Sequence, residues 1–317
     1  MLSTKRGKTM DNILNVLTAE EKISLSLRAL YNENGYSQYR MSKFEEYDLY
    51  VKNKDFLVSS NVLTFTDTNG KLLALKPDVT LSIIKNSRDI DGVMKVYYNE
   101  NVYRVSKGTK SFKEIMQAGL ECIGAVDNTV INEVLTLACK SLDLISKNNI
   151  LVISHLDIIS GVLDYCGLNI NDKKQVVKLL GEKNVFAIKQ LCEDLQLSKE
   201  NSILVQKLVT VYGTPEKVAD AMRDFAVNVQ TGKAIAELNE AITALNNAGF
   251  KDKIIIDFSV VNDMKYYNGI SFKGFIEGVP TGILSGGQYD NLMAKMDKKY
   301  QAIGFAVYLD ELSRIGG

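Results

Sequence analysis

The sequence has 317 residues, 46% apolar and 24% charged, and no run approaches the ~20 apolar residues of a membrane span, so we expect a cytoplasmic globular protein. Its 38 basic and 38 acidic side chains cancel, which argues against a general attraction to nucleic acid or to an anionic membrane. A single histidine excludes a multi-histidine metal site, and the four cysteines form no CxxC pair, so buried free thiols are expected rather than a zinc or redox site.

A helix is the first element that the sequence predicts. Thr18-Ala19-Glu20-Glu21 has the form of a capping box, and apolar residues follow it at helical spacing as far as Asn34-Gly35. The segment 62–76 is apolar on both sides of Asn69-Gly70, which predicts a β-hairpin. Residues 77–86 begin with Pro-Asp-Val-Thr and predict a short helix.

The middle of the chain changes from strands to helices. Two strands are expected around Asn99-Glu100-Asn101, followed by a strand over 112–124, a helix from about 128 to 145 and a strand over 149–158. Helical spacing then prevails to about residue 250. This shift predicts a helical insertion module over 166–250, between the two parts of a core domain formed by 1–165 and 251–317.

Strand patterns return in the last part of the chain. They cover 253–261, 265–278, 282–287 and 302–309, and a final helix follows. Because these strands follow one another in hairpins rather than alternating strictly with helices, the sequence predicts an α+β fold with a mostly antiparallel sheet flanked by helices.

The strand over 112–124 is the first candidate for a binding surface. Gln117, Gly119 and Glu121 share one face, where a glycine between two polar side chains leaves room for a molecule to approach. A solvated sheet face is the alternative explanation of this pattern. The opposite face is predicted to enter the core through Met116, Ala118, Leu120 and Cys122.

A second candidate lies in the strand that begins near residue 265. Alternation places Tyr267, Gly269 and Ser271 on one face and Tyr266 on the other, although ordinary core packing of the aromatic residues explains the pattern equally well. His155 lies in an apolar strand and is interpreted as a satisfied structural histidine rather than a general base. The sequence contains no G-x-S-x-G or HExxH motif, so it predicts a pocket and no catalytic residues.

Five segments, taken in order, resemble the catalytic core of histidyl-tRNA synthetase, a class II aminoacyl-tRNA synthetase. The resemblance covers roughly residues 15–165 and 250–317, and the predicted helical module falls where that family has its insertion. It implies a class II synthetase-like core. The segments that carry it are LALKPDVT, NVYRVSKGTKSFKEIMQAGLECIG, MKYYNGISF, GGQYDNL and AIGFAVYLDEL.

The resemblance implies a binding site for histidine. Its α-amino group would be held by Asp78, Thr80 and Gln117, and its imidazole would meet Glu121 and Tyr267, with the adjacent Tyr266 counted among the histidine-binding residues. Asp78 stands where the synthetase usually has glutamate, so its reach is one methylene shorter.

The nucleotide half of the family's site is altered. Arg104 is present at the expected position, but Asn262, Gln288 and Glu311 stand where the family has arginines, and Tyr308 replaces a glycine. Because arginines and Mg²⁺ stabilise charge on the α-phosphate of ATP, these replacements imply a degraded nucleotide site and the loss of adenylation.

The sequence also ends without the about 90 to 100 further residues that an anticodon-binding domain would need. This combination resembles the regulatory subunits of ATP phosphoribosyltransferase, in the first step of histidine biosynthesis. It implies a non-catalytic protein without cofactor or metal, a short-form catalytic subunit as partner in a hetero-oligomer, a homodimer of this chain, and histidine as effector, with no tRNA bound. Two alternatives are a divergent synthetase-like enzyme that still activates an amino acid, and a scaffold whose pocket is vestigial.

Overall fold

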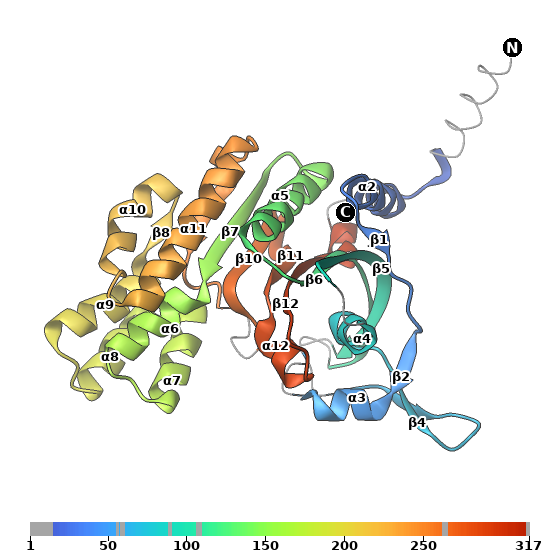
Figure 1. Ribbon diagram of the computed structural model, residues 1–317, viewed down its shortest axis with the longest axis horizontal. Helices are drawn as coiled ribbons and strands as arrows, with labels where there is room; N and C mark the ends of the chain where they lie inside the picture. The colour runs from blue at the N-terminus through green and yellow to red at the C-terminus, as the bar shows by residue number, and fades with distance from the viewer. Residues whose placement is uncertain are drawn as a thin grey trace, which may run out of the picture.

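The computed structural model describes residues 15–54, 57, 61–87, 91–105, 110–261 and 266–314. Within these residues, the centre is a nine-stranded sheet (Figure 1). Neighbouring strands in it are antiparallel, except for the two parallel pairs β1–β5 and β7–β9. The strands lie in the order β1 (Ser37–Gln38), β5 (Val93–Val105), β6 (Phe112–Gly124), β12 (Gln301–Tyr308), β11 (Val279–Gln288), β10 (Asn268–Ile276), β7 (Asn149–His155), β9 (Ile254–Asp257) and β8 (Tyr212–Gly213). The predicted α+β fold with a mostly antiparallel sheet is therefore confirmed.

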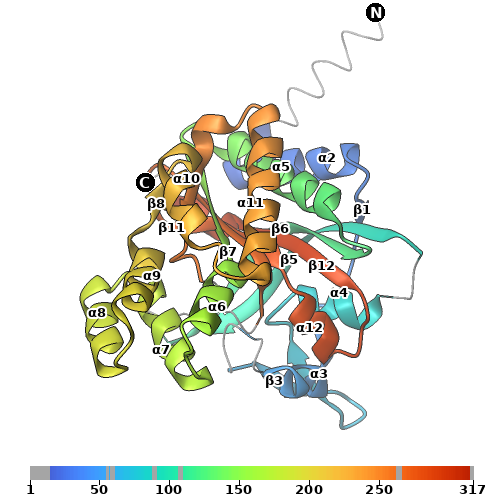
Figure 2. The same ribbon diagram turned by 60° about the vertical axis from the view of Figure 1, so that its left-hand side comes forward.

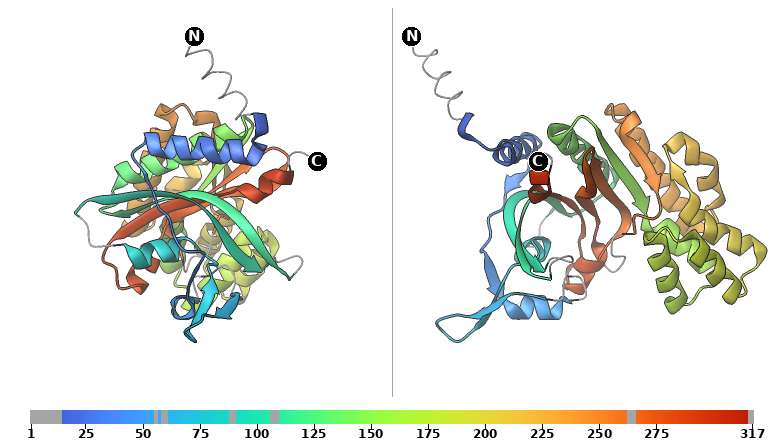
Figure 3. Two further views of the ribbon diagram at one scale, coloured as in Figure 1. Left: turned by 90° about the vertical axis from the view of Figure 1, so that its right-hand side faces the viewer. Right: turned by 180° about the vertical axis from the view of Figure 1, so that it is seen from behind.

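Helices cover the two faces of this sheet unequally. On one face, α2 (Ala19–Glu33) and α5 (Asn128–Ile145) lie side by side and close the larger hydrophobic core (Figure 3). On the other face, α4 (Thr80–Asn86) and α12 (Asp290–Lys295) build a smaller core over part of the sheet. Beside them lies a small sheet with the strand order β2 (Phe44–Glu46), β4 (Leu72–Leu75) and β3 (Thr64–Thr66). In the chain, α3 (Tyr47–Lys52) connects β2 to β3. The incompletely covered part of this second face holds the pocket described below.

Short-range signals placed several of these elements as predicted. At α2, the Thr18 hydroxyl accepts from Glu21 N at 3.2 Å and the Glu21 carboxylate accepts from Thr18 N at 2.8 Å, which completes the capping box. In the hairpin between β3 and β4, Gly70 has a φ of +78°, the left-handed conformation that a glycine adopts without steric cost. The helices predicted over 77–86 and 128–145 are α4 and α5.

Three element predictions were wrong in detail. Residues 95–105 form one strand, β5, rather than two, because Asn99 to Asn101 pair without interruption with β6 and their side chains find partners, as when Asn99 Nδ2 donates to Ser24 Oγ at 2.6 Å. β7 ends at His155, and α6 begins one residue later. The final helix is a 3₁₀-helix, η3 (Leu309–Arg314), whose three-residue period buries Leu309 and Leu312 together.

A run of helices packs beside the β7 end of the sheet (Figure 2). Its core is continuous with that of the sheet, and β8 within it pairs with β9. The division into a core domain and an insertion module over 166–250 stays a prediction. These helices are α6 (Leu156–Tyr165), α7 (Ile170–Gly181), α8 (Val185–Asp194), α9 (Lys199–Thr210), α10 (Pro215–Asp224) and α11 (Val229–Asn247), after which η2 (Lys251–Lys253) leads into β9.

Two expectations from composition can be compared with the fold. All four cysteines are free and buried, as predicted. None of the helices in the described ranges is both long and apolar enough to cross a membrane.

Candidate functional site: a polar pocket on the sheet

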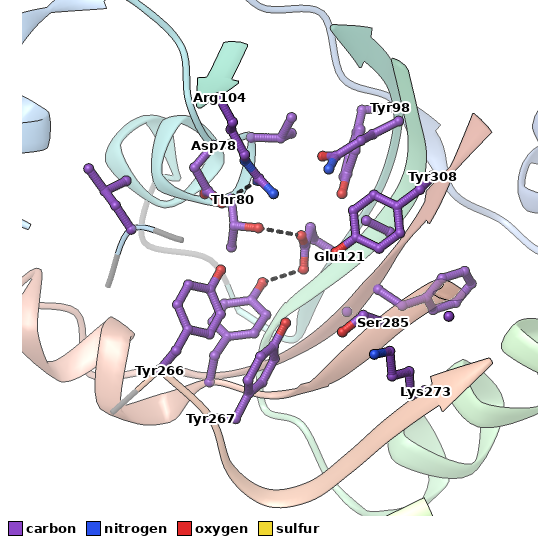
Figure 4. Close-up of a pocket in the computed structure, with 18 of the residues that line it drawn as sticks. Asp78, Thr80, Tyr98, Arg104, Glu121, Tyr266, Tyr267, Lys273, Ser285 and Tyr308 are labelled. Carbon is purple, nitrogen blue, oxygen red and sulfur yellow. Dashed lines mark hydrogen bonds and ion pairs between the residues drawn. The ribbon is translucent and has the colours of Figure 1, made fainter. Parts of the chain in front are cut away.

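A pocket of about 480 Å³ opens on the second face of the sheet (Figure 4). Its floor is made by β6, β12, β11 and β10, and one wall is made by the residues that lead into α4. A volume of this size is typical of small-molecule sites. The pocket is lined by carboxylates, hydroxyls, an amide and basic groups as well as by rings, so it suits a small polar ligand.

Glu121 lies at the bottom of the pocket and is only 2% exposed. Its Oε1 accepts a hydrogen bond from Thr80 Oγ1 at 2.8 Å, and its Oε2 accepts one from Tyr289 OH at 2.7 Å. Burial is the main cause that raises the pKa of Glu121 to about 8, partly offset by these two hydrogen bonds. On the neighbouring strand, Gly304 leaves the space that the carboxylate fills, since a Cβ there would overlap Oε2. The carboxyl group at the bottom of the pocket is therefore mostly protonated near neutral pH.

A second carboxylate stands at the pocket wall beside a cation. Asp78 Oδ1 accepts from Leu81 N at 3.0 Å and so fixes the start of α4, while Oδ2 lies 3.4 Å from Arg104 Nη2. Arg104 is held in turn by Pro77, whose carbonyl accepts from Nε at 2.6 Å. This end of the pocket thus offers a negative and a positive group side by side, as Figure 4 shows.

Gln117 supplies an amide that the protein leaves partly unsatisfied. The residue is 2% exposed and lines the pocket, yet its Nε2 has no hydrogen-bond partner among the described residues. A buried donor without a partner is costly, and an acceptor on a ligand would satisfy it. The face analysis of β6 agrees with this arrangement, because Gln117 and Glu121 both face the pocket while Leu120 and Cys122 enter the core.

The paired tyrosines differ from the prediction. Tyr266 and Tyr267 both line the pocket, with ring centroids 4.6 Å apart, so the expectation that Tyr266 points to the other face was wrong. The reason is that β10 begins only at Asn268, and strand alternation does not apply to the two tyrosines. Gly269 and Ser271, which alternation grouped with Tyr267, are absent from the pocket lining.

The gap over Gly119 is already filled within the protein. A Cβ at this position would overlap the Tyr98 hydroxyl and the Phe305 carbonyl oxygen, so the glycine admits a tyrosine rather than a ligand. Tyr98 and Tyr289 belong to the site and were missed, although Tyr289 stands in GGQYDNL, one of the segments that carry the family resemblance. Lys273 and Ser285 were also missed; their pairing across β10 and β11 places them side by side on the pocket floor.

Of the residues predicted for the degraded nucleotide site, some line the pocket and others lie outside it. Arg104 and Tyr308 line the pocket. Gln288 does not; it is buried, and its Oε1 accepts from Ile270 N at 2.6 Å. Glu311 lies outside the lining as well, and its carboxylate accepts from the hydroxyl of Thr281 at 2.8 Å. Asn262 lies outside the described residues.

The expected satisfied histidine is not satisfied. His155 is 1% exposed, and neither ring nitrogen has a hydrogen bond among the described residues. Its Nε2 lies 3.7 Å from Glu237 Oε1, beyond hydrogen-bond distance. His155 is remote from the pocket lining. Within the described ranges, no cluster of three or more His, Cys, Asp or Glu side chains could hold a metal ion.

The family model that describes histidyl-tRNA synthetase matches residues 11–312 of this chain. Among curated proteins, an ATP phosphoribosyltransferase regulatory subunit of Alkaliphilus metalliredigens is 26% identical over 288 residues, covering 89% of this chain and 73% of that protein.

Solved structures share the fold. An ATP phosphoribosyltransferase regulatory subunit/histidyl-tRNA synthetase from Bacillus halodurans superimposes with a TM-score of 0.84 at 24% identity, covering 94% of this chain and 79% of that one. A chain of the ATP phosphoribosyl transferase complex from Thermotoga maritima gives a TM-score of 0.73 at 17% identity, covering 92% of this chain and 98% of that one. These likenesses establish a class II synthetase-like fold.

Proposed function

Because this chain belongs to the histidyl-tRNA synthetase family, we propose that its pocket binds free histidine and that the protein is a non-catalytic regulatory subunit of ATP phosphoribosyltransferase. The name of the Alkaliphilus relative supports the regulatory assignment. The Thermotoga chain, which belongs to a complex, supports a separate catalytic subunit as partner. We propose a short-form catalytic subunit in a hetero-oligomer, built on a homodimer of this chain, with histidine as effector and without tRNA.

The observation that carries the histidine proposal is the buried Glu121 at the pocket floor. A carboxyl group that already accepts from two hydroxyls can still accept from an imidazole N–H, and the Tyr267 ring lines the same pocket. Histidine offers both an imidazole N–H and the zwitterion of an α-amino acid.

The other end of the pocket suits the zwitterion. Asp78 is an acceptor for the α-ammonium group, and Arg104 is a donor for the α-carboxylate. Gln117 was expected to hold the α-amino group, but its unpaired Nε2 is a donor, so we assign it to the α-carboxylate instead. Thr80, which donates a hydrogen bond to Glu121, lies between the two ends of the pocket and fixes their relative position. Every charged group of the ligand thus has an oppositely charged or hydrogen-bonding counterpart.

A triphosphate is matched poorly by the same lining. Among the described lining residues the cations are Arg104 and Lys273, and Figure 4 places them at opposite ends of the pocket. Arg104 is moreover paired with Asp78, and the Tyr308 ring stands over the floor between them. Phosphoryl and adenylyl transfer rely on clustered cations around the phosphates, so we propose that the chain does not form histidyl-adenylate.

Calorimetry of the purified chain tests the ligand. Histidine should bind; histidinol, which lacks the carboxylate, should bind more weakly; and ATP with Mg²⁺ should neither bind tightly nor support pyrophosphate exchange. Exchange activity would instead establish a divergent synthetase-like enzyme. Tyr267→Phe should weaken histidine binding, whereas Tyr165→Phe, on an exposed tyrosine of α6, should leave it unchanged.

Reconstitution tests the regulatory role. The chain should co-purify with a short-form ATP phosphoribosyltransferase and raise its activity, and histidine should inhibit the complex. Inhibition that survives Tyr267→Phe and Glu121→Ala undiminished would mean that the pocket is vestigial and that contact alone activates the partner.

A further inference from the structure

A second cavity, of about 560 Å³, lies between the helices and the β7 end of the sheet. Its floor consists of Ile150 and Val152 from β7 and Phe275 from β10, on the same sheet face as the histidine pocket. The opposite wall comes from the end of α7 and from β8, including Lys183 and Tyr212. The two cavities meet at Lys273, which lines both.

Apolar side chains are left exposed at this cavity. β7 is buried along its length except for Ile150, which is 40% exposed and lines the cavity floor. Tyr212, on the facing wall, is 58% exposed. Large apolar groups on two facing walls of a concave site are typical of a surface that binds an apolar body.

The cavity also carries basic side chains. Lys183 and Lys273 line it, and the single lining carboxylate among the described residues is Asp257. One donor of the Lys183 ammonium reaches Asp257 Oδ2 at 2.7 Å, and the ammonium lies 4.9 Å from the centre of the Tyr212 ring. An ammonium has three donors, so further acceptors can be bound.

Lys183 follows the end of α7 in a left-handed backbone conformation, as Gln196 does after α8. The residue has a φ of +51°, in the left-handed region that glycine or asparagine usually occupies after a helix. A lysine adopts this conformation at a steric cost that a glycine would avoid. On β11, Gly282 lines the first pocket and leaves the space along which the stem of Lys273 lies, because a Cβ there would overlap it.

We propose that this cavity is a second ligand site, for a small organic anion with an apolar or aromatic body. The apolar body would lie on Ile150, Val152 and Phe275, and the anionic group would be held by Lys183 and Lys273. The site does not depend on histidine binding in the first pocket, since its floor and its Lys183 wall are separate from that pocket.

The probe for this site is 1-anilinonaphthalene-8-sulfonate, an aromatic anion whose fluorescence rises in apolar surroundings. It should bind the full chain, and the uncharged N-phenyl-1-naphthylamine should bind at least about 10-fold more weakly, because it lacks the group that the lysines hold. Ile150→Glu places a carboxylate on the cavity floor and should weaken the anionic probe by about 10-fold or more. Ile203→Glu is the matched control, since Ile203 is 45% exposed on α9 and lies outside the cavity.

Equal affinity of the probe for the two variants would overturn the proposal, and so would equal affinity for the charged and uncharged probes. If circular dichroism shows that Ile150→Glu is unfolded, a crystal structure of the unmodified chain with the sulfonate probe tests the site instead. The sulfonate should then lie within hydrogen-bond distance of Lys183 or Lys273, and a probe bound elsewhere would refute the site. Neither result bears on histidine binding, which calorimetry measures separately.

Discussion

The raised pKa of Glu121 predicts how histidine affinity depends on pH. In the empty pocket this carboxyl titrates at about 8, and a free imidazole titrates at about 6.5. Between these values the free partners carry one proton, on Glu121. The bound carboxyl–imidazole pair also carries one proton, wherever it sits between them. Binding should therefore exchange no net proton in this window, and the affinity should be nearly flat.

Outside the window the sign of the linkage reverses. Below about 6.5 the free partners together carry two protons, so binding releases one and the affinity falls as the pH falls. Above about 8 they carry none, so binding takes one up and the affinity falls as the pH rises. Each pH unit beyond either limit should change Kd by up to tenfold, which is about 1.4 kcal/mol.

Calorimetry in buffers with different heats of ionisation counts these protons directly. Glu121→Gln should lose the uptake above pH 8 that Glu121 causes, and it should weaken binding at neutral pH. Removing a charged hydrogen-bond partner costs roughly 1.5–3 kcal/mol, about 10- to 150-fold in Kd. The variant keeps the ionisation of the ligand's own α-ammonium group, so the difference between the two proteins isolates Glu121.

Glu114→Gln is the matched control, because Glu114 lies on the same strand but at its exposed end, bonded to Asn101 and Tyr103. This variant should show the same Kd and the same proton exchange as the unmodified protein at every pH. Net release of a proton at pH 7.2 would refute the reasoning, since it would mean that the bound carboxylate faces an imidazole with no proton between them. The same holds for an affinity that rises steadily from pH 6 to pH 9.

Three further predictions concern stability. The pKa of Glu121 is higher in the folded chain than in the unfolded chain, so the contribution of this residue to the free energy of unfolding is fully present below about pH 4.5 and is lost as the pH rises to about 8. Glu121→Gln should therefore stabilise the ligand-free chain at pH 7 by on the order of 3 kcal/mol, which a higher Tm would show. Gly304→Ala should cost about 1–3 kcal/mol and weaken histidine binding, because the added Cβ displaces Glu121, whereas Gly232→Ala, in open space on α11, should stabilise by about 0.5–1 kcal/mol in urea titrations. Lys76 is fully buried and paired with Glu100 at 2.5 Å, so Lys76→Met should cost about 3–5 kcal/mol and the double variant with Glu100→Gln clearly less; equal losses would show that the pairing contributes little.

Local sequence signals foretold much of this fold. The capping box at Thr18, the turn at Gly70 and the alternation along β6 each depend on residues within a few positions, and each is present in the structure. The alternation also placed Gln117 and Glu121 on one face, which is the floor of the pocket. Family resemblance supplied what periodicity lacked, since it connected residues 78, 117 and 267 into one site.

What the sequence did not foretell depends on contacts between distant segments. Asn99 sits inside a strand, where Ser24, far away in the chain, accepts a hydrogen bond from its Nδ2. The space over Gly119 is taken by Tyr98 from the adjacent strand. Tyr289 reaches Glu121 across a separation of 168 residues. No pattern within one segment contains such information.

The relation between the two cavities follows from strand order rather than from any single segment. One row of paired residues crosses six strands on the pocket face: Tyr98, Gly119, Ala306, Ser285, Lys273 and Val152. β7 joins this row only because the sheet places it beside β10, more than a hundred residues later in the chain. Lys273 is the one member of the row that lines both cavities. The two cavities therefore share one basic side chain, while the rest of their linings comes from different residues.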